Sequence, residues 1–378
     1  MEDMASTEES GAEDFDFESH REQALADYSK LRALYEDYSR VVRDLVEAAL
    51  ADASVRPHSI EHRAKDPESF GEKASRRSDA DPQHPKYREP LKDIHDLAGC
   101  RVITYFLNDV DKVRDVIEKE FTVIEKINRS SYLRGSGAPG YESYHFIVDL
   151  GPKRYGLTEY SRYSGRVVEI QVRTILQHAW AEIEHDIQYK SVEELPRDIA
   201  RRFSELAGLI AIGDREFQAI ADAHAEVLER AQQSIAEGRL DDVEITPETL
   251  KIHLDRRLGP DGRMSDWSYA WTTRLLKRLG FSSLGQVDRC LDEYDHDSLS
   301  RRVYGSRQGQ LTRFELVIAA AVGPALWSAR HPWSEDPDFD WFEEWSERKY
   351  KRIAEAGFEV GKCASELSRG APPHVGRS

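Results

Sequence analysis

The stretch from Gly165 to Lys190, GRVVEIQVRTILQHAWAEIEHDIQYK, changes its hydrophobic period half-way along. In its first half, apolar and polar residues alternate strictly, which is typical of a half-buried strand. In its second half, apolar residues fall three or four positions apart, as on an amphipathic helix. We therefore predict a strand that runs directly into a helix. One face of this strand would carry Glu169, Gln171 and Arg173. On an arbitrary strand such a face is only solvated, so its meaning depends on the rest of the chain.

The size and charge of the chain limit what it can be. Its 378 residues are enough for two or three domains. A net charge of −17 argues against general electrostatic capture of DNA or of an anionic membrane. The N-terminus lacks the pattern of a signal peptide, and the most apolar run, Leu316 to Leu326, is too short to span a bilayer. Three cysteines far apart in the sequence exclude a disulfide framework and suit a reducing compartment. We expect a cytoplasmic protein that binds neither DNA nor membrane.

Composition and periodicity divide the chain into five parts. Residues 1–19 hold eight acidic residues and no basic one, which predicts a disordered acidic arm. Residues 20–237 mix helix patterns with strand patterns, the latter at 100–106, 121–127, 141–150 and in the opening stretch. A linker over 238–247 leads to a helical accessory domain over 248–367, with its core helix at 314–326. Residues 368–378 would form a loose tail.

A basic cluster surrounds a predicted helix start in the first of these domains. Asp66, Pro67 and Glu68 are typical of a helix N-terminus, where proline is tolerated and the dipole favours anions. Ser69 and Lys73 are four positions apart and so share one face of that helix. Arg63 and Lys65 lie just before it. Cations that converge on a helix N-terminus are suited to a polyphosphate, although basic stretches are usually solvated surface.

Two carboxylates are placed beside predicted strands and next to arginines. Asp96 precedes the strand that contains Arg101, and Glu169 lies on the strand that contains Arg173. One or two carboxylates together with substrate phosphates are the usual ligands of Mg²⁺. Residues 125–173 carry eight basic and five acidic residues, a local charge of +3 within an acidic protein. This basic charge is concentrated in the loops.

Five motifs in one order resemble the synthetase domain of the RelA/SpoT family, the pyrophosphokinases that make ppGpp and pppGpp. They are RAK…S…K, DLAGCR, GYESYH, VEIQVRT and HAWAEIEHDIQYK, and the resemblance covers roughly residues 20–235. It implies an α+β fold related to nucleotidyltransferases, with a mixed, mostly antiparallel sheet and flanking helices. In this chain an all-α C-terminal domain would follow.

The resemblance also implies roles for particular residues. Those expected to bind ATP are Arg63, Lys65, Ser69, Lys73 and Arg101. Asp96 and Glu169 match the residues that hold Mg²⁺, and Glu169 also matches the one that activates the attacking hydroxyl. Tyr141 corresponds to the tyrosine that stacks on the acceptor base. His145, Gln171 and Arg173 stand at positions that line the acceptor site.

The activity implied is transfer of the β,γ-pyrophosphate of ATP to the 3′-hydroxyl of GDP or GTP. We expect no alarmone hydrolysis. The hydrolase domain of long relatives would precede the synthetase domain, and only a short helical arm does so here. One alternative is a toxin-type relative that pyrophosphorylates the 3′-CCA end of tRNA and is restrained by its C-terminal domain. A second alternative is an inactive nucleotide-binding module. Relatives often self-assemble, so a homo-oligomer is also open.

Overall fold

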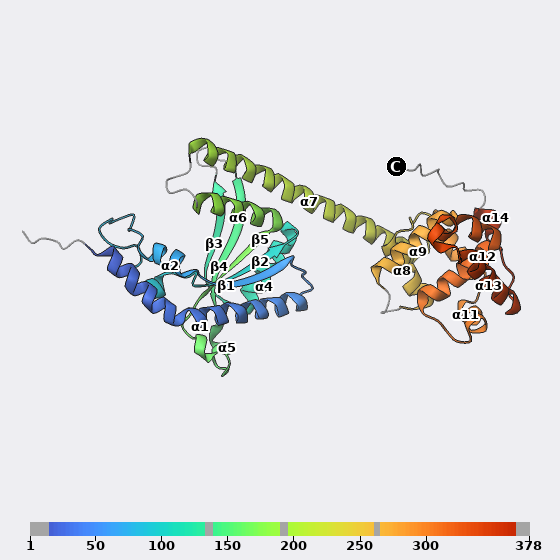
Figure 1. The fold of residues 1–378 in the computed structure, drawn as a ribbon, viewed down its shortest axis with the longest axis horizontal. Coiled ribbons are helices and arrows are strands. Elements are labelled where there is room, and N and C mark those ends of the chain that lie inside the picture. Colours follow the sequence, from blue (N-terminus) through green and yellow to red (C-terminus); the bar gives the residue numbers. More distant parts are fainter. Residues whose placement is uncertain (1–14, 133–138, 190–195, 261–264, 368–378) are drawn as a thin grey trace, which may run out of the picture. The chain divides into compact units, whose positions relative to one another are not determined.

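A computed structural model describes residues 15–132, 139–189, 196–260 and 265–367. The chain divides into two compact units, Met1–Ala221 and Asp222–Ser378 (Figure 1). The first unit contains a five-stranded sheet flanked by helices, and the described part of the second unit is helical. The predicted α+β fold followed by an all-α domain is therefore confirmed.

The sheet of the first unit has the strand order β1-β2-β5-β4-β3. Its strands are β1 (Ser59–Ala64), β2 (Ala98–Thr104), β3 (Thr122–Tyr132), β4 (Pro139–Asp149) and β5 (Val168–Thr174). Among these strands β2 and β5 pair in parallel, and the other three pairs are antiparallel. Gln171 of β5 lies opposite Arg101 of β2 on one side and opposite His145 of β4 on the other. Side chains distant in the sequence thus form rows across the sheet.

The helices of the first unit follow the predicted apolar periodicity. They are α1 (Phe17–Asp52), α2 (Pro67–Ala74), α3 (Pro90–Asp93), α4 (Leu107–Glu120), α5 (Gly151–Tyr155), the 3-10 turn η1 (Ser161–Tyr163), α6 (Ile175–Tyr189) and α7 (Arg197–Glu237), which extends into the second unit. α1 begins three residues before the expected start at His20, because the Asp16 side chain accepts a hydrogen bond from the Ser19 backbone N–H at 3.0 Å.

The two faces of β5 have different partners. Val168, Ile170 and Val172 are buried in one apolar core with residues of α1 and α4. α6 lies on the other side of the sheet from α1 (Figure 1). At the end of β5, the Thr174 hydroxyl donates to Asp214 of α7 at 2.9 Å. The predicted strand is confirmed, with Glu169, Gln171 and Arg173 on the face away from the apolar core. It is not half-buried as expected, however, because Glu169 and Arg173 are buried as well.

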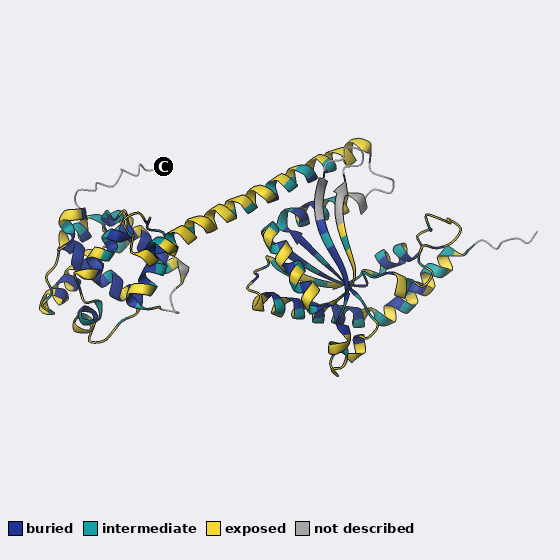
Figure 2. Cartoon of the chain, turned by 180° about the vertical axis from the view of Figure 1, so that it is seen from behind, coloured by how far each residue is buried: buried dark blue, intermediate teal, exposed yellow. Residues whose placement is uncertain are grey.

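The second unit packs its helices around α12 (Gln310–Arg330). The others are α8 (Pro247–Leu258), α9 (Asp266–Leu279), α10 (Leu284–Asp292), α11 (His296–Tyr304), α13 (Phe342–Glu355) and α14 (Ala364–Leu367), with 3-10 turns η2 (Pro332–Glu335) and η3 (Pro337–Phe339). Figure 2 shows buried residues both along the sheet and inside this second unit. Cys290 and Cys363, far apart in the sequence, belong to this one core as free thiols.

The apolar helix of the second unit is a core helix, as predicted. By length and composition alone, the segment Gln310–Ser334 could cross a membrane, and it is the one such segment in the described ranges. However, 67% of its most apolar window is buried inside the protein. The helix is kinked at Gly323, whose φ of 76° favours glycine and which precedes Pro324. A Cβ at Gly323 would also approach the Gly361 Cα to 3.1 Å.

Candidate active site

A buried polar group lies on the face of β4 and β5 away from the core. Glu169 is 9% exposed, Arg173 8% and His145 4%. Buried charged and polar side chains are stable only when they have partners. The strand register supplies these partners, because side chains on adjacent strands that point to the same face lie next to one another.

The two oxygens of Glu169 are bound by different side chains. Its Oε1 lies 2.7 Å from His145 Nδ1, and its Oε2 accepts a hydrogen bond from Gln171 Nε2 at 2.8 Å. Behind His145, Arg173 Nε donates to the Ser143 hydroxyl at 3.1 Å, and Arg173 Nη2 lies 3.4 Å from His145 Nε2. A guanidinium can only donate, so His145 Nε2 accepts and the Nδ1 hydrogen points to Glu169. The imidazole thus holds the carboxylate in place.

Asp96 forms a second charged group with two lysines. Its Oδ2 lies 2.9 Å from Lys65 Nζ and 3.1 Å from Lys73 Nζ. Lys65 is fixed by its backbone, which donates to the Leu97 carbonyl at 3.0 Å and accepts from the Tyr28 hydroxyl at 2.7 Å. Lys73 is carried by α2, whose N-cap is Asp66 as predicted. The other oxygen of Asp96, Oδ1, is buried and has no hydrogen-bond partner among the described residues.

The electrostatics of Asp96 result from two opposed effects. Burial raises the pKa of its carboxyl, but the ammonium groups of Lys65 and Lys73 outweigh burial and bring the pKa below its usual value. The negative charge of Glu169, like burial, raises the pKa of Asp96. The two carboxylates are therefore close enough to repel each other, and Asp96 is ionised at neutral pH.

The remaining predicted residues are placed in different ways. Arg63 is exposed on β1. Ser69 donates its backbone N–H to Asp66 at 2.9 Å in the first turn of α2. Arg101 lies 3.3 Å from Glu61 of β1 and 3.0 Å from Glu182 of α6, so it joins these two elements. Tyr141 lies on β4, but its side chain is outside the described part of the structure.

Sequence reasoning missed three participants in these contacts. Ser143 connects Arg173 to His145, and Glu61 and Glu182 bind Arg101. Ser143 could have been predicted, because it lies inside the GYESYH motif two residues before His145 and so shares a face of the strand with it. The partners of Arg101 depend on a strand, β1, that the sequence did not reveal.

The donor set around Asp96 fits a divalent cation that arrives with phosphates. No group of three or more His, Cys, Asp or Glu side chains in the described ranges could hold a metal ion alone. Mg²⁺ does not need such a group, since it is commonly bound by one or two carboxylates and completed by substrate phosphates and water. The buried, unpartnered Asp96 Oδ1 is a suitable hard oxygen ligand.

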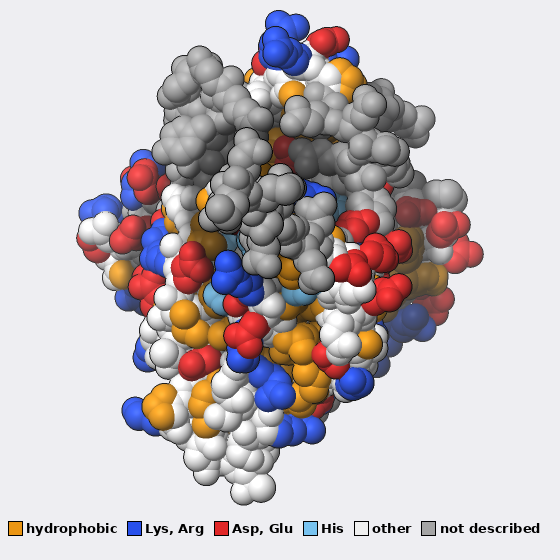
Figure 3. Space-filling view, turned by 90° about the vertical axis from the view of Figure 1, so that its left-hand side faces the viewer, with side chains coloured by type: hydrophobic (Ala, Val, Ile, Leu, Met, Phe, Trp, Pro, Cys, Tyr) orange, Lys and Arg blue, Asp and Glu red, His pale blue; other side chains and the backbone are white. Residues whose placement is uncertain are grey.

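Acidic and basic side chains are interspersed on the surface of the first unit. The face in Figure 3 shows both signs side by side, rather than one large patch of either. Two of the predicted basic loop residues are already bound within the unit: Arg154 to Glu120 at 2.8 Å, and Arg162 to Asp37. Both arginines are therefore already paired with acidic side chains.

Comparison with known proteins agrees with these motifs. The family described as a region found in RelA / SpoT proteins matches residues 62–194. The GTP pyrophosphokinase YjbM of Bacillus subtilis (strain 168) is 31% identical over 160 residues, which are 42% of this chain and 69% of YjbM. This chain belongs to the RelA/SpoT family.

Other RelA/SpoT relatives match over similar ranges. The GTP pyrophosphokinase YwaC of the same organism is 31% identical over 120 residues, 32% of this chain, and the chain spans only about half of YwaC, 54%. Among solved structures, small alarmone synthetase 1 from Bacillus subtilis has a TM-score of 0.42 and 23% identity, covering 53% of this chain and 98% of its own. A GTP pyrophosphokinase family protein from Streptococcus pneumoniae has a TM-score of 0.37 and 26% identity, with 54% and 94% covered.

Proposed function

We propose that this RelA/SpoT-family protein transfers the β,γ-pyrophosphate of ATP to the 3′-hydroxyl of GDP or GTP. The observation that carries the proposal is that two carboxylates beside β2 and β5 are held by different partners. Asp96 is set between two lysines and keeps one buried oxygen without a partner, while Glu169 is oriented by His145 and Gln171. The names of the relatives YjbM and YwaC, both GTP pyrophosphokinases, support the same reaction.

Lys65 and Lys73 would bind the phosphates of ATP. In the absence of ATP their ammonium groups share one oxygen of Asp96. Phosphate oxygens can take the place of that carboxylate oxygen, so the same cations neutralise the charge on the transferred group. Asp96, with Glu169 beside it, would hold Mg²⁺, which when bound supplies further charge neutralisation. Phosphoryl transfer depends mainly on such positioning and electrostatic stabilisation.

Glu169 would act as the general base. It accepts the proton of the acceptor 3′-hydroxyl while that oxygen bonds to the β-phosphorus of ATP. The bond between the β-phosphorus and the oxygen that bridges it to the α-phosphate breaks, and AMP leaves with that oxygen. His145 and Gln171 keep the carboxylate in position, since a general base must reach the proton it removes.

The acceptor is decided by a direct labelling experiment. The purified protein is incubated with γ-labelled ATP and, separately, with GDP, GTP or deacylated tRNA. We expect labelled ppGpp from GDP and labelled pppGpp from GTP. Label on tRNA alone would replace this proposal by the toxin-type reaction, and label on no acceptor would favour an inactive binding module. Incubation of ppGpp with the protein and Mn²⁺ tests the hydrolase, and we expect no pyrophosphate release.

A further inference from the structure

The second unit carries a group of aromatic side chains that its core does not enclose. This aromatic patch consists of Trp271, Trp333, Phe339, Trp341 and Trp345. Trp341 is 42% exposed and the other four are partly exposed. A monomer seldom exposes contiguous large apolar side chains without a binding role.

The patch is continuous because its rings contact one another. The Trp333 ring stacks on Phe339 with centroids 5.1 Å apart and on Trp271 at 5.4 Å. Trp341 lies 5.4 Å from Trp333 and 6.1 Å from Trp345. Three separate elements therefore contribute to one surface: α9, the segment of η2 and η3, and the beginning of α13.

Acidic side chains surround the part of the patch formed by residues 333–345, whereas Trp271 is followed on its face of α9 by Arg274 and Arg278. The exposed ones between η2 and the middle of α13 are Asp336, Asp338, Asp340, Glu343, Glu344 and Glu347. Asp340 directly precedes Trp341, and Glu344 follows it by one helical turn on the same side of α13. The sequence from 331 to 347 contains no lysine or arginine. Arg348, just beyond it, is ion-paired to Glu344 at 3.0 Å.

One ring of the patch, Trp345, already binds a cation from the protein itself, together with the buried Trp327. Lys349 is 9% exposed, and its Nζ lies 4.3 Å from the centre of the Trp345 ring and 4.7 Å from that of Trp327. Ammonium and guanidinium groups are attracted to the faces of indole rings, most strongly where water is excluded. The contact of Lys349 with Trp345 thus shows the cation–π interaction that the exposed rings of the patch can offer to a partner.

We propose that the aromatic patch is a docking surface for a basic segment of a partner protein, rich in arginine or lysine. Guanidinium groups of the partner would stack on Trp341 and its neighbours, and the surrounding carboxylates would pair with the same cations. Nucleic-acid bases also stack on aromatic rings, but their phosphates would be repelled by six exposed carboxylates. The carboxylates around Trp341 therefore favour a polycationic polypeptide at this end of the patch.

Fluorescence anisotropy of a labelled peptide tests this on the full-length protein. The probe is a ten-residue peptide of alternating glycine and arginine, and the comparison probes are a glycine–glutamate peptide and a ten-nucleotide oligouridylate. We expect micromolar binding of the arginine peptide only. Trp341→Ala should weaken it roughly fivefold, the size of one cation–π contact. The matched control is Tyr105→Ala, which removes a 49% exposed aromatic from the first unit and should leave binding unchanged.

A second pair of variants separates the patch from the general acidity of the protein. Asp338→Asn combined with Asp340→Asn should weaken binding and reduce its dependence on salt. Asp242→Asn combined with Glu229→Gln makes the same change in charge at exposed positions elsewhere in the second unit and should have little effect. Equal affinities for the two double variants, or for Trp341→Ala and Tyr105→Ala, would show only nonspecific attraction and overturn the proposal. So would tighter binding of the oligouridylate.

Discussion

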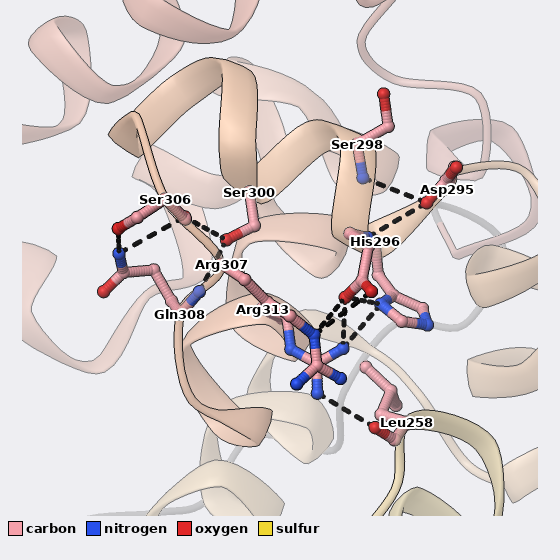
Figure 4. Close-up of polar contacts among 10 residues, drawn as sticks. Leu258, Asp295, His296, Ser298, Ser300, Ser306, Arg307, Gln308 and Arg313 are labelled. Carbon is pink, nitrogen blue, oxygen red and sulfur yellow. Dashed lines mark hydrogen bonds and ion pairs between the residues drawn. The ribbon is translucent and has the colours of Figure 1, made fainter.

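One carboxylate from each unit, Asp96 in the first and Asp297 in the second, is held between two cations. In the first unit, Asp96 lies between Lys65 and Lys73. In the second, Asp297 lies between Arg307 and Arg313 (Figure 4): its Oδ1 is 2.9 Å from Arg307 Nε and 2.6 Å from Arg313 Nη1. Charge alone would not distinguish the two clusters.

The difference lies in which polar atoms remain without partners. Both oxygens of Asp297 are bound, because Arg307 Nε also reaches Oδ2 at 3.1 Å. Arg313 further donates to the Leu258 carbonyl at 2.9 Å and so connects α12 to the end of α8. Asp96 instead keeps a buried oxygen without a partner in the described structure, and its cations are lysines, which can move more freely. The carboxylate of Asp297, with both oxygens bound, stabilises the fold, whereas that of Asp96 has an oxygen available to a ligand.

The largest effect on the rate of pyrophosphate transfer should come from removing the carboxylate of Asp96 or of Glu169. Asp96→Asn and Glu169→Gln keep the size of each side chain but remove its charge and its capacity to accept a proton. We expect each to lower the rate of pyrophosphate transfer about a thousandfold, as for loss of a general base or metal ligand. Transfer from labelled ATP measures this. Glu159→Gln, at an exposed position, is the control. Activity within tenfold of the unaltered protein would reject these roles.

Replacing one lysine should affect both rate and pH dependence. Burial raises the pKa of Asp96 and Lys65 lowers it, so Lys65→Met should make that pKa higher than in the unaltered protein. We expect about a hundredfold loss in kcat/KM for ATP, with activity falling at a less acidic pH than in the unaltered protein. The control is Lys153→Met, which removes an exposed lysine of α5. An unchanged acid limb in the pH–rate profile would show that Lys65 does not lower the pKa of Asp96.

The cluster of the second unit should show the opposite behaviour. Arg313→Met removes a buried guanidinium and leaves the Leu258 carbonyl and Asp297 with fewer donors. We expect the free energy of unfolding of the second unit to fall by about 2 kcal/mol. Six of the seven tryptophans lie in this unit, so tryptophan fluorescence in urea reports its unfolding. Pyrophosphate transfer by the folded variant should be unchanged, and a large loss would contradict a purely structural role.

The stability of the second unit should depend on pH. In the second unit, burial, followed by the positive charges of Lys349 and Arg278, lowers the pKa of His331 to about 3. The folded state then binds fewer protons than the unfolded state, so stability is lost as pH falls below about 6.5. We expect a loss of about 1 to 2 kcal/mol between pH 7 and pH 5 in urea unfolding. The pKa of the Asp96 carboxyl is held below its usual value by Lys65 and Lys73 despite its burial, so Asp96 itself stays ionised across this window.

A variant of His331 tests whether this histidine causes the loss of stability at low pH. His331 Nδ1 accepts the Trp333 backbone N–H at 3.2 Å. His331→Asn retains an acceptor for this N–H but has no titratable group. Its stability should therefore change less between pH 7 and pH 5. An equal change in both proteins would assign the effect to other histidines.

Several parts of the candidate site could be predicted from local patterns. The alternation around Glu169 predicted a strand with one polar face, and the structure confirms it. The N-cap Asp66 and Pro67 predicted the start of α2, which carries Lys73. These features depend on the periods of strands and helices and on capping, all of which act within a few residues.

Other parts could not be predicted because their signals are weak or lie far away in the chain. β1 was missed, since Ser59–Ala64 is a partly exposed edge strand with few β-branched residues. Its position explains why Arg101 binds Glu61. In the second unit, the helical spacing of Trp341 and Trp345 is typical of core packing, and the sequence did not show that Trp341 would be 42% exposed.

The sequence by itself determined which side chains share a face of each strand or helix, because that depends on backbone geometry with a short, regular period. Only the tertiary structure decided which faces meet. It brings Lys65 to Asp96 across 31 positions and His145 to Glu169 across 24, through strand order and register. It also decided that Asp96 keeps an oxygen unbound while Asp297 does not. That distinction follows from the packing of neighbouring elements around each carboxylate, which no local pattern encodes.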